Sequence, residues 1–260
     1  MRRKPNIILF TLVITATALA LNTQAKLDGK GQHVKAELSM PTVDQILDKH
    51  VRAIGGKNAY DKLTTRIAKG TIRIQAGKEA FTGSYEDYAE APNKRVQFIR
   101  FSLSNGTEYD TSHGFNGAIG WGSEIGKNGV RFNKLSGAKL VAAMREADFY
   151  SGIKLKQLYS GLRLKGNKRI ASRQFYIVEA IPEEGNPETL YFDTKTGLLA
   201  RRDIEQNNMA AVQPVAQTYY EDYKEVDGIM LPLTLRQVSP GNDSSRSTPL
   251  TSFGSSAAAG

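Results

Sequence analysis

The sequence predicts an α+β fold that is mainly antiparallel β, an unclosed curved β-barrel of about ten to eleven strands with helices covering its concave face. From residue 65 onward, apolar and polar residues alternate in segments bounded by Gly, Asn and Pro, which is the pattern of half-buried strands. The linkers are short and strands do not alternate with helices, which disfavours a parallel sheet. A large sheet that curls needs a filling for its concave face, and two amphipathic helical segments can provide it.

The first 25 residues have the features of a secretory signal. Arg2, Arg3 and Lys4 precede an uncharged apolar run at 7–21, and Ala25 supplies a small residue before the expected cleavage. The run is shorter than the roughly 20 residues that span a bilayer, although an uncleaved anchor helix is an alternative. The expected organisation is a signal peptide at 1–25, a flexible arm at 26–40, one domain at 41–240 and a disordered Ser/Thr/Gly/Ala-rich tail at 241–260.

Composition excludes several classes of protein. The 260-residue chain has no cysteine, which rules out disulfides, thiolate zinc sites, a cysteine nucleophile and a lipid-modified N-terminal cysteine. Three of its 35 basic residues lie in the expected signal, so the exported chain would carry 32 basic against 26 acidic residues. Because no dense Lys/Arg stripe with interleaved aromatic residues is present, we expect no nucleic-acid partner. The modest positive charge is compatible with transient contact with an anionic membrane.

Two helices are expected, one before the first group of strands and one after it. Thr42 and Gln45 form a capping box at the start of the first helix, and Gly55 and Gly56 end it. The second helix runs from 136 to about 149, with apolar residues at helical spacing. Both are expected to form a lid over the concave face, through the apolar residues Ile46, Leu47, Leu140 and Met144.

Ten strands are expected from the alternation of apolar and polar residues, at 65–74, 79–90, 95–103, 106–115, 161–170, 174–182, 188–193, 197–206, 215–226 and 229–238. The glycine-rich stretch 117–129, which contains Trp121, is expected to be a connection between strands. It is not a phosphate cradle, because it lacks the G-K-[ST] ending of a P-loop and no helix follows at once.

The segment "YFDTKTGLL" at 191–199 allows two interpretations. Its letters are close to the D-K-T-G-T loop on which ion-pumping ATPases carry a phosphoryl group, which would make Asp193 an acceptor. However, Thr194 precedes Lys195 and no βαβ unit surrounds the segment, as such a site would require. We therefore expect a hairpin turn, in which Asp193 caps the turn with its side chain and Gly197 supplies a positive φ.

Residues typical of catalysis or metal binding are not clustered in the sequence. His33, His50 and His113 are far apart and lack spacings such as H-E-x-x-H, and no G-x-S-x-G elbow is present. We therefore expect no metal, no cofactor and no catalytic residue. Carboxylates are plentiful, as in "YEDY" at 85–88, so a hydrolase with a carboxylate pair stays an alternative.

The strongest remaining signal is apolar alternation along the strands. One face of each strand gathers the residues that we expect to bind lipid: Ile72, Ile74, Phe81, Tyr85, Phe98, Leu190, Phe192, Leu231, Leu233 and Leu235. Such faces form either a packed sandwich core or the interior of a half-open barrel that takes an acyl chain. The sequence does not distinguish these two arrangements.

Several segments together resemble the LolA/LolB-like group of outer-membrane lipoprotein-sorting proteins. They are "TVDQILDKHVRAIGGKNAYDKLTTRIAKGTI", "SGAKLVAAMREADFY", "LYFDTKTGLLARRD" and "TYYEDYKEVDGIMLPLTLR", and the resemblance covers 41–238. It implies an unclosed antiparallel barrel whose apolar concave side is covered by helices. In this group the soluble carrier holds lipoprotein acyl chains while it crosses the periplasm. Lack of cysteine resembles that carrier, although none of its functional residues can be matched to a position here.

The function expected from these observations is non-enzymatic. The protein would be a soluble periplasmic carrier or binder of lipid or lipoprotein acyl chains in an apolar cavity. One alternative is an envelope docking or sensor module of the same fold, with a packed core and a protein partner. The alternative ranked last is the hydrolase with a carboxylate site.

Overall fold

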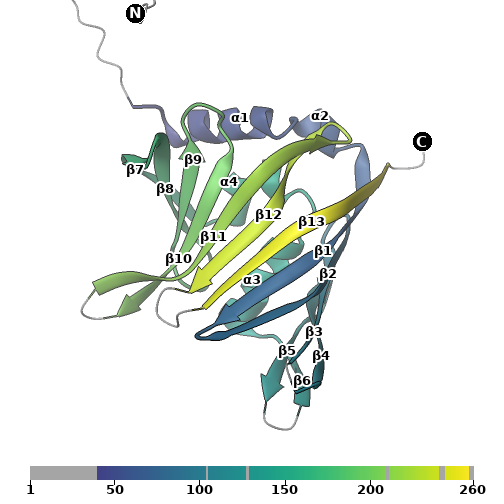
Figure 1. Ribbon diagram of the computed structural model, residues 1–260. Helices are drawn as coiled ribbons and strands as arrows, with labels where there is room; N and C mark the ends of the chain where they lie inside the picture. Colours follow the sequence, from purple (N-terminus) through teal and green to yellow (C-terminus); the bar gives the residue numbers. More distant parts are fainter. Residues whose placement is uncertain (1–39, 104, 127–128, 209–210, 240–243, 258–260) are drawn as a thin grey trace, which may run out of the picture. The chain divides into compact units, whose positions relative to one another are not determined.

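The computed structural model describes residues 40–257 apart from 104, 127–128, 209–210 and 240–243 (Figure 1). The expected signal peptide, and the expected arm except for Met40, lie outside the described residues. The compact unit begins at Met40 and continues past residue 240, where the domain was expected to end.

Thirteen antiparallel strands form one sheet in this unit, in the order β6-β5-β4-β3-β2-β1-β13-β12-β11-β10-β9-β8-β7. The end strands β6 and β7 do not pair with each other, so the predicted unclosed barrel is confirmed. The strands are β1 (Leu63–Ala76), β2 (Glu79–Glu90), β3 (Lys94–Ser102), β4 (Glu108–Asn116), β5 (Gly120–Gly126), β6 (Gly129–Lys134), β7 (Gly161–Ile170), β8 (Arg173–Ile181), β9 (Glu188–Asp193), β10 (Leu199–Asn208), β11 (Ala211–Val226), β12 (Ile229–Ser239) and β13 (Ser244–Ala257).

Three of these strands were not predicted from the sequence. The glycine-rich stretch, expected to be a connection, forms β5 and β6. Its Trp121 pairs with Gly114 of β4, and a Cβ on Gly114 would lie 2.9 Å from the indole ring, so the ring occupies the space that glycine leaves. The third strand is β13, which pairs with both β1 and β12 and so lies in the interior of the sheet. The expectation of a disordered tail is therefore wrong for residues 244–257.

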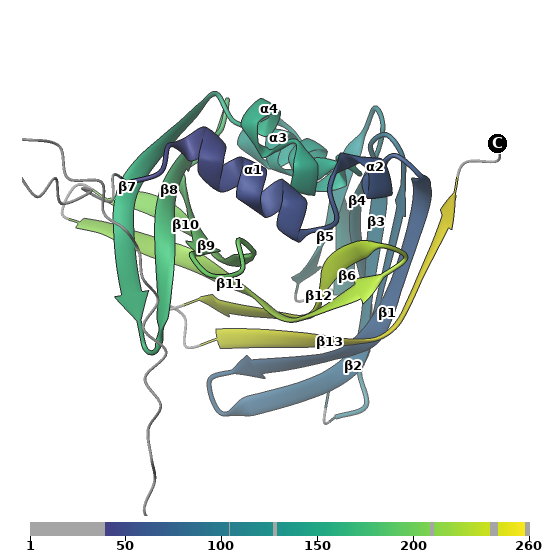
Figure 2. The same ribbon diagram turned by 90° about the horizontal axis from the view of Figure 1, so that it is seen from above.

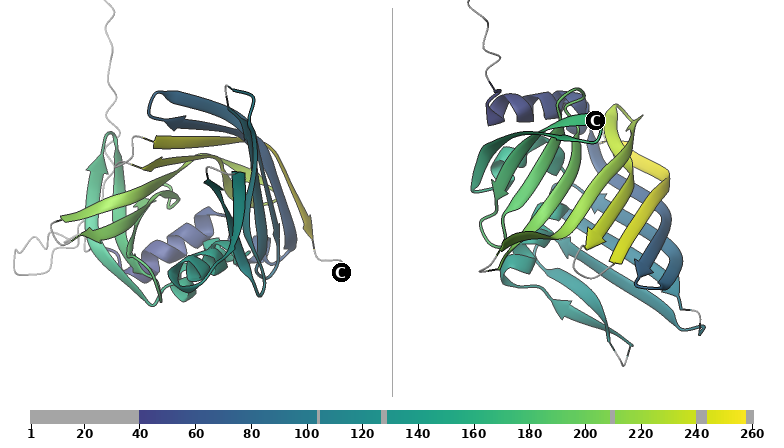
Figure 3. Two further views of the ribbon diagram at one scale, coloured as in Figure 1. Left: turned by 90° about the horizontal axis from the view of Figure 1, so that it is seen from below. Right: turned by 60° about the vertical axis from the view of Figure 1, so that its left-hand side comes forward.

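The helical segments are α1 (Val43–Ala53), α2 (Lys57–Tyr60), α3 (Gly137–Ala147), η1 (Ser151–Ile153) and α4 (Leu155–Leu158). Seen from above, the sheet curves from β7 round to β1, and α1, α3 and α4 lie across the opening of the curve (Figure 2). The views in Figure 3 show the same helices within the arms of the sheet. The helices therefore cover the concave face, as predicted.

Helix α1 is capped at its N-terminus, and its apolar face and its C-terminus join it to the sheet. The predicted capping box is present, because the backbone N–H of Gln45 donates to Thr42 Oγ1 (3.2 Å) and that of Thr42 donates to Gln45 Oε1 (2.9 Å). Ile46 and Leu47 are buried in a cluster with residues of β8 and β9. At the other end, the N–H of Met230 donates to the carbonyl of Ile54 (3.1 Å), which joins α1 to β12.

Helix α3 packs against β3, β4 and β5. Leu140 lies against the backbone of Gly120, where a Cβ would be 2.9 Å from its Cδ1. Met144 was expected to face the cavity, but its side chain is 47 % exposed and does not line it. The neighbouring Arg145 and Glu146 line the cavity instead. The expected lid face of α3 is thus wrong at Met144, because a charged part of the helix faces the concave side.

The segment "DTKTG" forms a turn, as predicted. Asp193 Oδ1 accepts the backbone N–H groups of Lys195 (2.9 Å) and Thr196 (2.8 Å), and Gly197 has a φ of 80°. Arg173 Nε donates to Asp193 Oδ2 (2.8 Å), and these contacts hold the pKa of Asp193 below its ordinary value although burial alone would raise it. The carboxylate is therefore fully engaged in stabilising the turn.

Most buried apolar residues of the described chain fall into three separate clusters. The first gathers around Ile54, Phe149 and Ile229, the second lies under α1 around Phe192, and the third joins Ile72, Tyr85 and Ile99 on β1–β3. A packed sandwich would instead have one continuous core. The space between the three clusters is the cavity described next.

Candidate ligand-binding cavity

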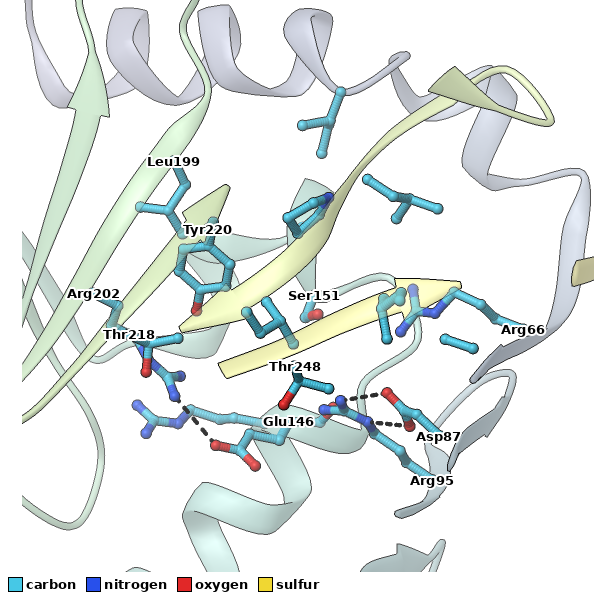
Figure 4. Close-up of a pocket in the computed structure, with 18 of the residues that line it drawn as sticks. Arg66, Asp87, Arg95, Glu146, Ser151, Leu199, Arg202, Thr218, Tyr220 and Thr248 are labelled. Atoms are coloured by element: carbon cyan, nitrogen blue, oxygen red, sulfur yellow. Dashed lines mark hydrogen bonds and ion pairs between the residues drawn. The ribbon is translucent and has the colours of Figure 1, made fainter. Parts of the chain in front are cut away.

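A cavity of about 360 Å³ lies between the concave face of the sheet, α1 and the segment from α3 to α4. Each of the three apolar clusters contributes to its wall, for example through Ile54, Leu190 and Tyr85. The wall differs in chemistry from one end of the cavity to the other. In Figure 4, Leu199 lies on the side towards α1, whereas Arg95, Glu146 and Arg202 gather on the side away from it.

The end of the cavity next to α1 is apolar. Ile54 at the C-terminus of α1, Leu155 and Leu158 of α4, Leu199 of β10 and Met230 of β12 line it. These residues come from elements that are far apart in the sequence and meet only because α1 and α4 close the opening of the sheet. This end of the cavity offers contact to hydrocarbon.

Arginines from five elements line the cavity: Arg66 on β1, Arg95 on β3, Arg145 on α3, Arg202 on β10 and Arg246 on β13. We call the side away from α1, where Arg95 and Arg202 lie in Figure 4, the arginine end. Two carboxylates line it, Asp87 of β2 and Glu146 of α3, and a third, Glu188 of β9, is buried beside Arg145. Five guanidinium groups against three carboxylates leave an excess of two positive charges.

Arg95 and Asp87 form a bidentate ion pair. Arg95 Nε donates to Asp87 Oδ1 (2.9 Å) and Nη2 donates to Oδ2 (2.7 Å). Gln97 Nε2 donates to the hydroxyl of Tyr85 (2.7 Å), and that hydroxyl in turn lies 3.4 Å from Asp87 Oδ2. Burial alone would raise the pKa of Asp87, but Arg95 outweighs burial and lowers that pKa. Asp87 is therefore ionised at neutral pH, and its charge is matched within the protein.

Arg145 and Arg202 share two carboxylates. Arg145 Nη2 lies 2.6 Å from Glu188 Oε1, and Arg202 lies 3.3 Å from Glu146 Oε1 and 3.9 Å from Glu188 Oε2. The hydroxyl of Tyr159 also donates to Glu188 (2.6 Å). Nevertheless, Nε and Nη1 of Arg145 and Nε of Arg202 are buried with no hydrogen-bond acceptor among the described residues. An unsatisfied buried donor costs about 1–3 kcal/mol, so the network is not optimised for stability alone.

Arg66 and Arg246 differ from the other three arginines. Among the described residues, neither has a carboxylate within ion-pair distance. Arg66 lies over the ring of Phe149, 5.4 Å from its centroid, and Arg246 donates to Gln237 Oε1. Burial lowers the pKa of both guanidinium groups, although both stay protonated because an arginine keeps its charge inside proteins. Neither guanidinium therefore has a direct ion-pair partner among the described residues, although Asp87 acts on the charge of Arg66 and Glu146 on that of Arg246 from a longer distance.

His50 and His113 also line the cavity, and both are shifted towards the neutral form. Burial lowers the pKa of His50 to about 4, although its contact with the carbonyl of Gly197 raises it in part. Burial likewise lowers the pKa of His113. The excess positive charge of the cavity at neutral pH therefore comes from arginine alone.

The residues that the sequence nominated for lipid binding fall into two groups. Four line the cavity: Tyr85, Leu190, Leu231 and Leu235. Six do not line it: Ile72, Ile74, Phe81, Phe98, Phe192 and Leu233. Ile72 and Phe192 are instead almost fully buried, in the third and second apolar clusters. The structure thus brings together fewer than half of the nominated residues.

Two nominations from the sequence are wrong for identifiable reasons. Phe98 lies between Gln97 and Ile99, and because side chains alternate along β3, it faces away from Gln97, which lines the cavity. On that outer face its ring contacts Tyr88. Leu233 lies opposite Asp222, whose φ of 55° interrupts the regular strand pairing. Simple alternation from Leu231 to Leu235 therefore fails at this position.

Sequence reasoning missed the five arginines of the cavity. A usable signal was present, since Arg95, Gln97 and Ile99 alternate in phase and put a charged residue on the buried face. A charge on the inward face of a strand indicates a function, because burying it without one is costly.

Two classes of site are not found in the described part of the chain. No group of three or more His, Asp and Glu side chains there has an arrangement that could hold a metal ion. Over the same residues, no helix is both long and apolar enough to cross a membrane.

Comparison with known proteins identifies the fold. No protein-family model and no curated protein sequence matches the chain. Among solved structures, a DUF1329 family protein from Desulfovibrio piger aligns with a TM-score of 0.54 over 85 % of this chain and 95 % of its own, at 17 % identity. A LolA superfamily protein from Nitrosomonas europaea aligns with a TM-score of 0.53 over 82 % and 93 %, at 11 % identity.

A third structure, described as an outer membrane lipoprotein-sorting protein domain from Vibrio parahaemolyticus, aligns with a TM-score of 0.55 over 83 % of this chain and 93 % of its own, at 12 % identity. At such identities the likeness concerns the fold. The chain has the unclosed-barrel fold of LolA-like proteins, which confirms the resemblance found in the sequence.

Proposed function

We propose that this protein is exported to the periplasm by the signal peptide expected at 1–25, and that it binds an amphiphilic lipid there without catalysis. The observation that carries the proposal is the cavity of about 360 Å³, enclosed by helices within an unclosed sheet and apolar at one end. Ligand pockets in proteins measure about 300–1,000 Å³, so this cavity suits a ligand with a single acyl chain.

The energetics of the apolar end favour such a ligand. Each acyl CH₂ group that leaves water contributes about 0.8 kcal/mol to binding. An apolar surface of this kind must be covered when no ligand is bound, since exposed apolar patches promote association. Helices α1 and α4 provide that cover through Ile54, Leu155 and Leu158. The LolA-like fold adds support, because the neighbour from Vibrio parahaemolyticus is described as a lipoprotein-sorting domain.

Blocking the cavity tests the proposal directly. Leu235 and its cross-strand partner Tyr220 both line the cavity, so Leu235→Trp would place an indole in its space. We expect this variant to fold and to lose binding of a fluorescent fatty-acid probe. The matched control is Ile67→Trp, which adds the same side chain at a 41 % exposed position between two cavity-lining residues of β1. The control should bind the probe like the parent.

The outcomes separate this proposal from its rivals. If the parent protein never binds the probe and purifies without lipid by native mass spectrometry, the carrier proposal fails and a docking module with a protein partner takes its place. If Leu235→Trp melts far below Ile67→Trp and the parent binds nothing, the residue belongs to a packed core. Hydrolysis of the probe by the parent would support the carboxylate hydrolase instead.

A further inference from the structure

The hairpin formed by β5 and β6 exposes apolar side chains that the cavity does not explain. Phe132 of β6 is the most exposed large apolar residue of the described chain, at 65 %, and Ile125 of β5 is 46 % exposed. Neither residue lines the cavity. β6 is an end strand of the sheet, and the hairpin lies at the lower end of the compact unit, away from α1 (Figure 1). These side chains therefore face solvent at a projecting edge of the sheet.

The side chains on one face of this hairpin are ordered by chemistry. Three cross-strand pairs share the face, and from the turn to the base they are Ile125–Val130, Ser123–Phe132 and Trp121–Lys134. It is the face away from α3, because Gly120, the neighbour of Trp121, turns towards α3, where an added Cβ would lie 2.9 Å from Leu140. The face is thus apolar at the tip and carries an indole and an ammonium group at the base.

This order matches the depth profile of a membrane interface. Aliphatic side chains favour the acyl region, whereas Trp and Lys are typical of the head-group level, where their polar ends keep contact with water. The two residue steps from Ser123 to Ile125 span about 7 Å, and interfacial segments enter a bilayer by about 5–10 Å. Trp121 is held at the base of the hairpin, since its Nε1 donates to Ser112 Oγ of β4 (3.4 Å).

The charge of the hairpin favours an anionic surface over a protein. Residues 120–134 contain three basic residues and one acidic residue, a net charge of +2. Lys134 is exposed and has no ion-pair partner among the described residues. An anionic bilayer attracts this charge, whereas a second copy of the chain would bring the same charge against it. A protein partner would need about 800 Å² on each side, more than the apolar side chains of this tip offer.

We propose that the β5–β6 hairpin is a membrane-docking element. Ile125, Val130 and Phe132 enter an anionic lipid surface, and Trp121 and Lys134 stay at the level of its head groups. Two residues separate β6 from α3, which lines the cavity, so the docked hairpin holds the cavity close to the membrane. The proposal goes beyond lipid binding in the cavity, because the hairpin can bind a membrane whatever the cavity holds.

The test uses the only tryptophan of the chain, since Trp121 reports on the hairpin and does not line the cavity. The chain is used from residue 26 onward, because the apolar run at 7–21 would bind vesicles by itself and the compact unit begins at Met40. Vesicles of phosphatidylglycerol and phosphatidylcholine should sediment with the protein and shift the emission of Trp121 to shorter wavelengths. Vesicles of phosphatidylcholine alone should bind at least about tenfold more weakly. Lipids brominated near the head group should quench Trp121 more than lipids brominated at the chain end.

Variants locate the contact. Phe132→Ser and Ile125→Ser should each lower the partition into anionic vesicles about tenfold, since each removes an apolar side chain from the acyl region. The matched control is Ile67→Ser on β1, a 41 % exposed position four strands away from β5, which should bind like the parent. Lys134→Gln should lower the partition about fivefold, whereas Lys168→Gln, at an exposed position on the opposite end strand β7, should have little effect.

Each result decides the proposal. Failure of the parent to bind anionic vesicles, or equal binding to neutral ones, would overturn it, and so would full binding by both serine variants at the tip. Dimers that Phe132→Ser abolishes, in a parent that binds no vesicle, would instead assign the hairpin to contact between copies of the chain. Binding of a fatty-acid probe in the cavity is measured separately, so loss of vesicle binding alone leaves the lipid-binding proposal standing.

Discussion

His50 shows how burial sets the chemistry of a single side chain in this protein. Its ring is 4 % exposed, packs edge-on against Phe192 at a centroid distance of 5.2 Å, and its Nδ1 lies 3.1 Å from the carbonyl oxygen of Gly197. A carbonyl can only accept, so Nδ1 carries the proton of the neutral ring. Burial lowers the pKa of His50 to about 4. The ring is therefore a neutral donor that connects α1 to the β9–β10 turn.

This pKa predicts how stability depends on pH. Between the ordinary value of 6.5 and about 4, the unfolded chain binds a proton at this histidine and the folded chain does not. The free energy of unfolding should therefore fall as the pH is lowered through this window, by about 3 kcal/mol in total for His50. Urea unfolding of the parent and of His50→Asn, whose amide N–H can still donate to Gly197, measures the difference.

The variant should be less stable than the parent at neutral pH, because it loses ring packing, but its curve should be flatter between pH 6.5 and 4. His113 titrates in the same direction and is unchanged in both proteins, so it cancels in the comparison. Carboxylates with a lowered pKa, such as Asp87 and Asp193, lose their contribution only at lower pH. Parallel curves for the two proteins would show that His50 is already charged in the folded state.

At the scale of elements, the β9–β10 turn holds α1 against the sheet. Lys49 Nζ donates to the carbonyl of Thr194 (2.6 Å), and the next residue of the helix, His50, contacts Gly197. Gly197 has a φ of 80°, and a Cβ at this position would lie 2.8 Å from Lys49 Cγ and 3.1 Å from the Lys49 carbonyl oxygen. The turn can approach α1 this closely only because residue 197 lacks a side chain.

Gly197→Ala should therefore destabilise the protein for two reasons. A positive φ costs an L-residue roughly 1–2 kcal/mol, and the clash with α1 adds a further 1–3 kcal/mol, about as in other overpacked sites. Gly77→Ala is the matched control, since Gly77 has a φ of 59° and no heavy atom within 4 Å of an added Cβ. Thermal unfolding of both variants measures the difference. Equal melting temperatures would mean that the turn does not hold α1.

The sequence predicts the local elements of this fold better than the contacts between elements that are distant in the sequence. The capping box of α1, the turn at Asp193 and the ten expected strands follow from residue types and spacing within short segments. Strand β13 was missed because its Ser- and Thr-rich composition resembles a disordered tail, although Thr248 is buried and Leu250 lines the cavity. Its stability comes from pairing with β1 and β12, which are distant in sequence.

The candidate site was harder to predict than the fold, because it depends on which face of each strand turns inward. Alternation gave the correct face at Tyr85 and Leu190 and failed at Phe98, which faces outward. At Leu233 the alternation failed because the backbone is irregular at Asp222, which no pattern of residues in the sequence predicts. The arginines of the cavity escaped prediction because they come from five elements that only the folded sheet and α3 bring together.

At the scale of the whole molecule, the unclosed sheet and its helices produce a cavity with two chemically different ends. A closed barrel encloses its interior with strands alone, whereas an unclosed sheet leaves an opening that other elements must cover. Here β6 and β7 do not pair with each other, and α1, α3 and α4 cover the opening (Figure 2).

The central claim is that this cavity holds an amphiphile. The most direct measurement is a crystal structure of the protein with a fatty acid that carries bromine on its terminal carbon, located by anomalous scattering. The account predicts a bromine peak at the apolar end, near Leu199 and Met230. A bromine peak only outside the cavity, with ordered protein side chains filling the space between the three apolar clusters, would contradict it.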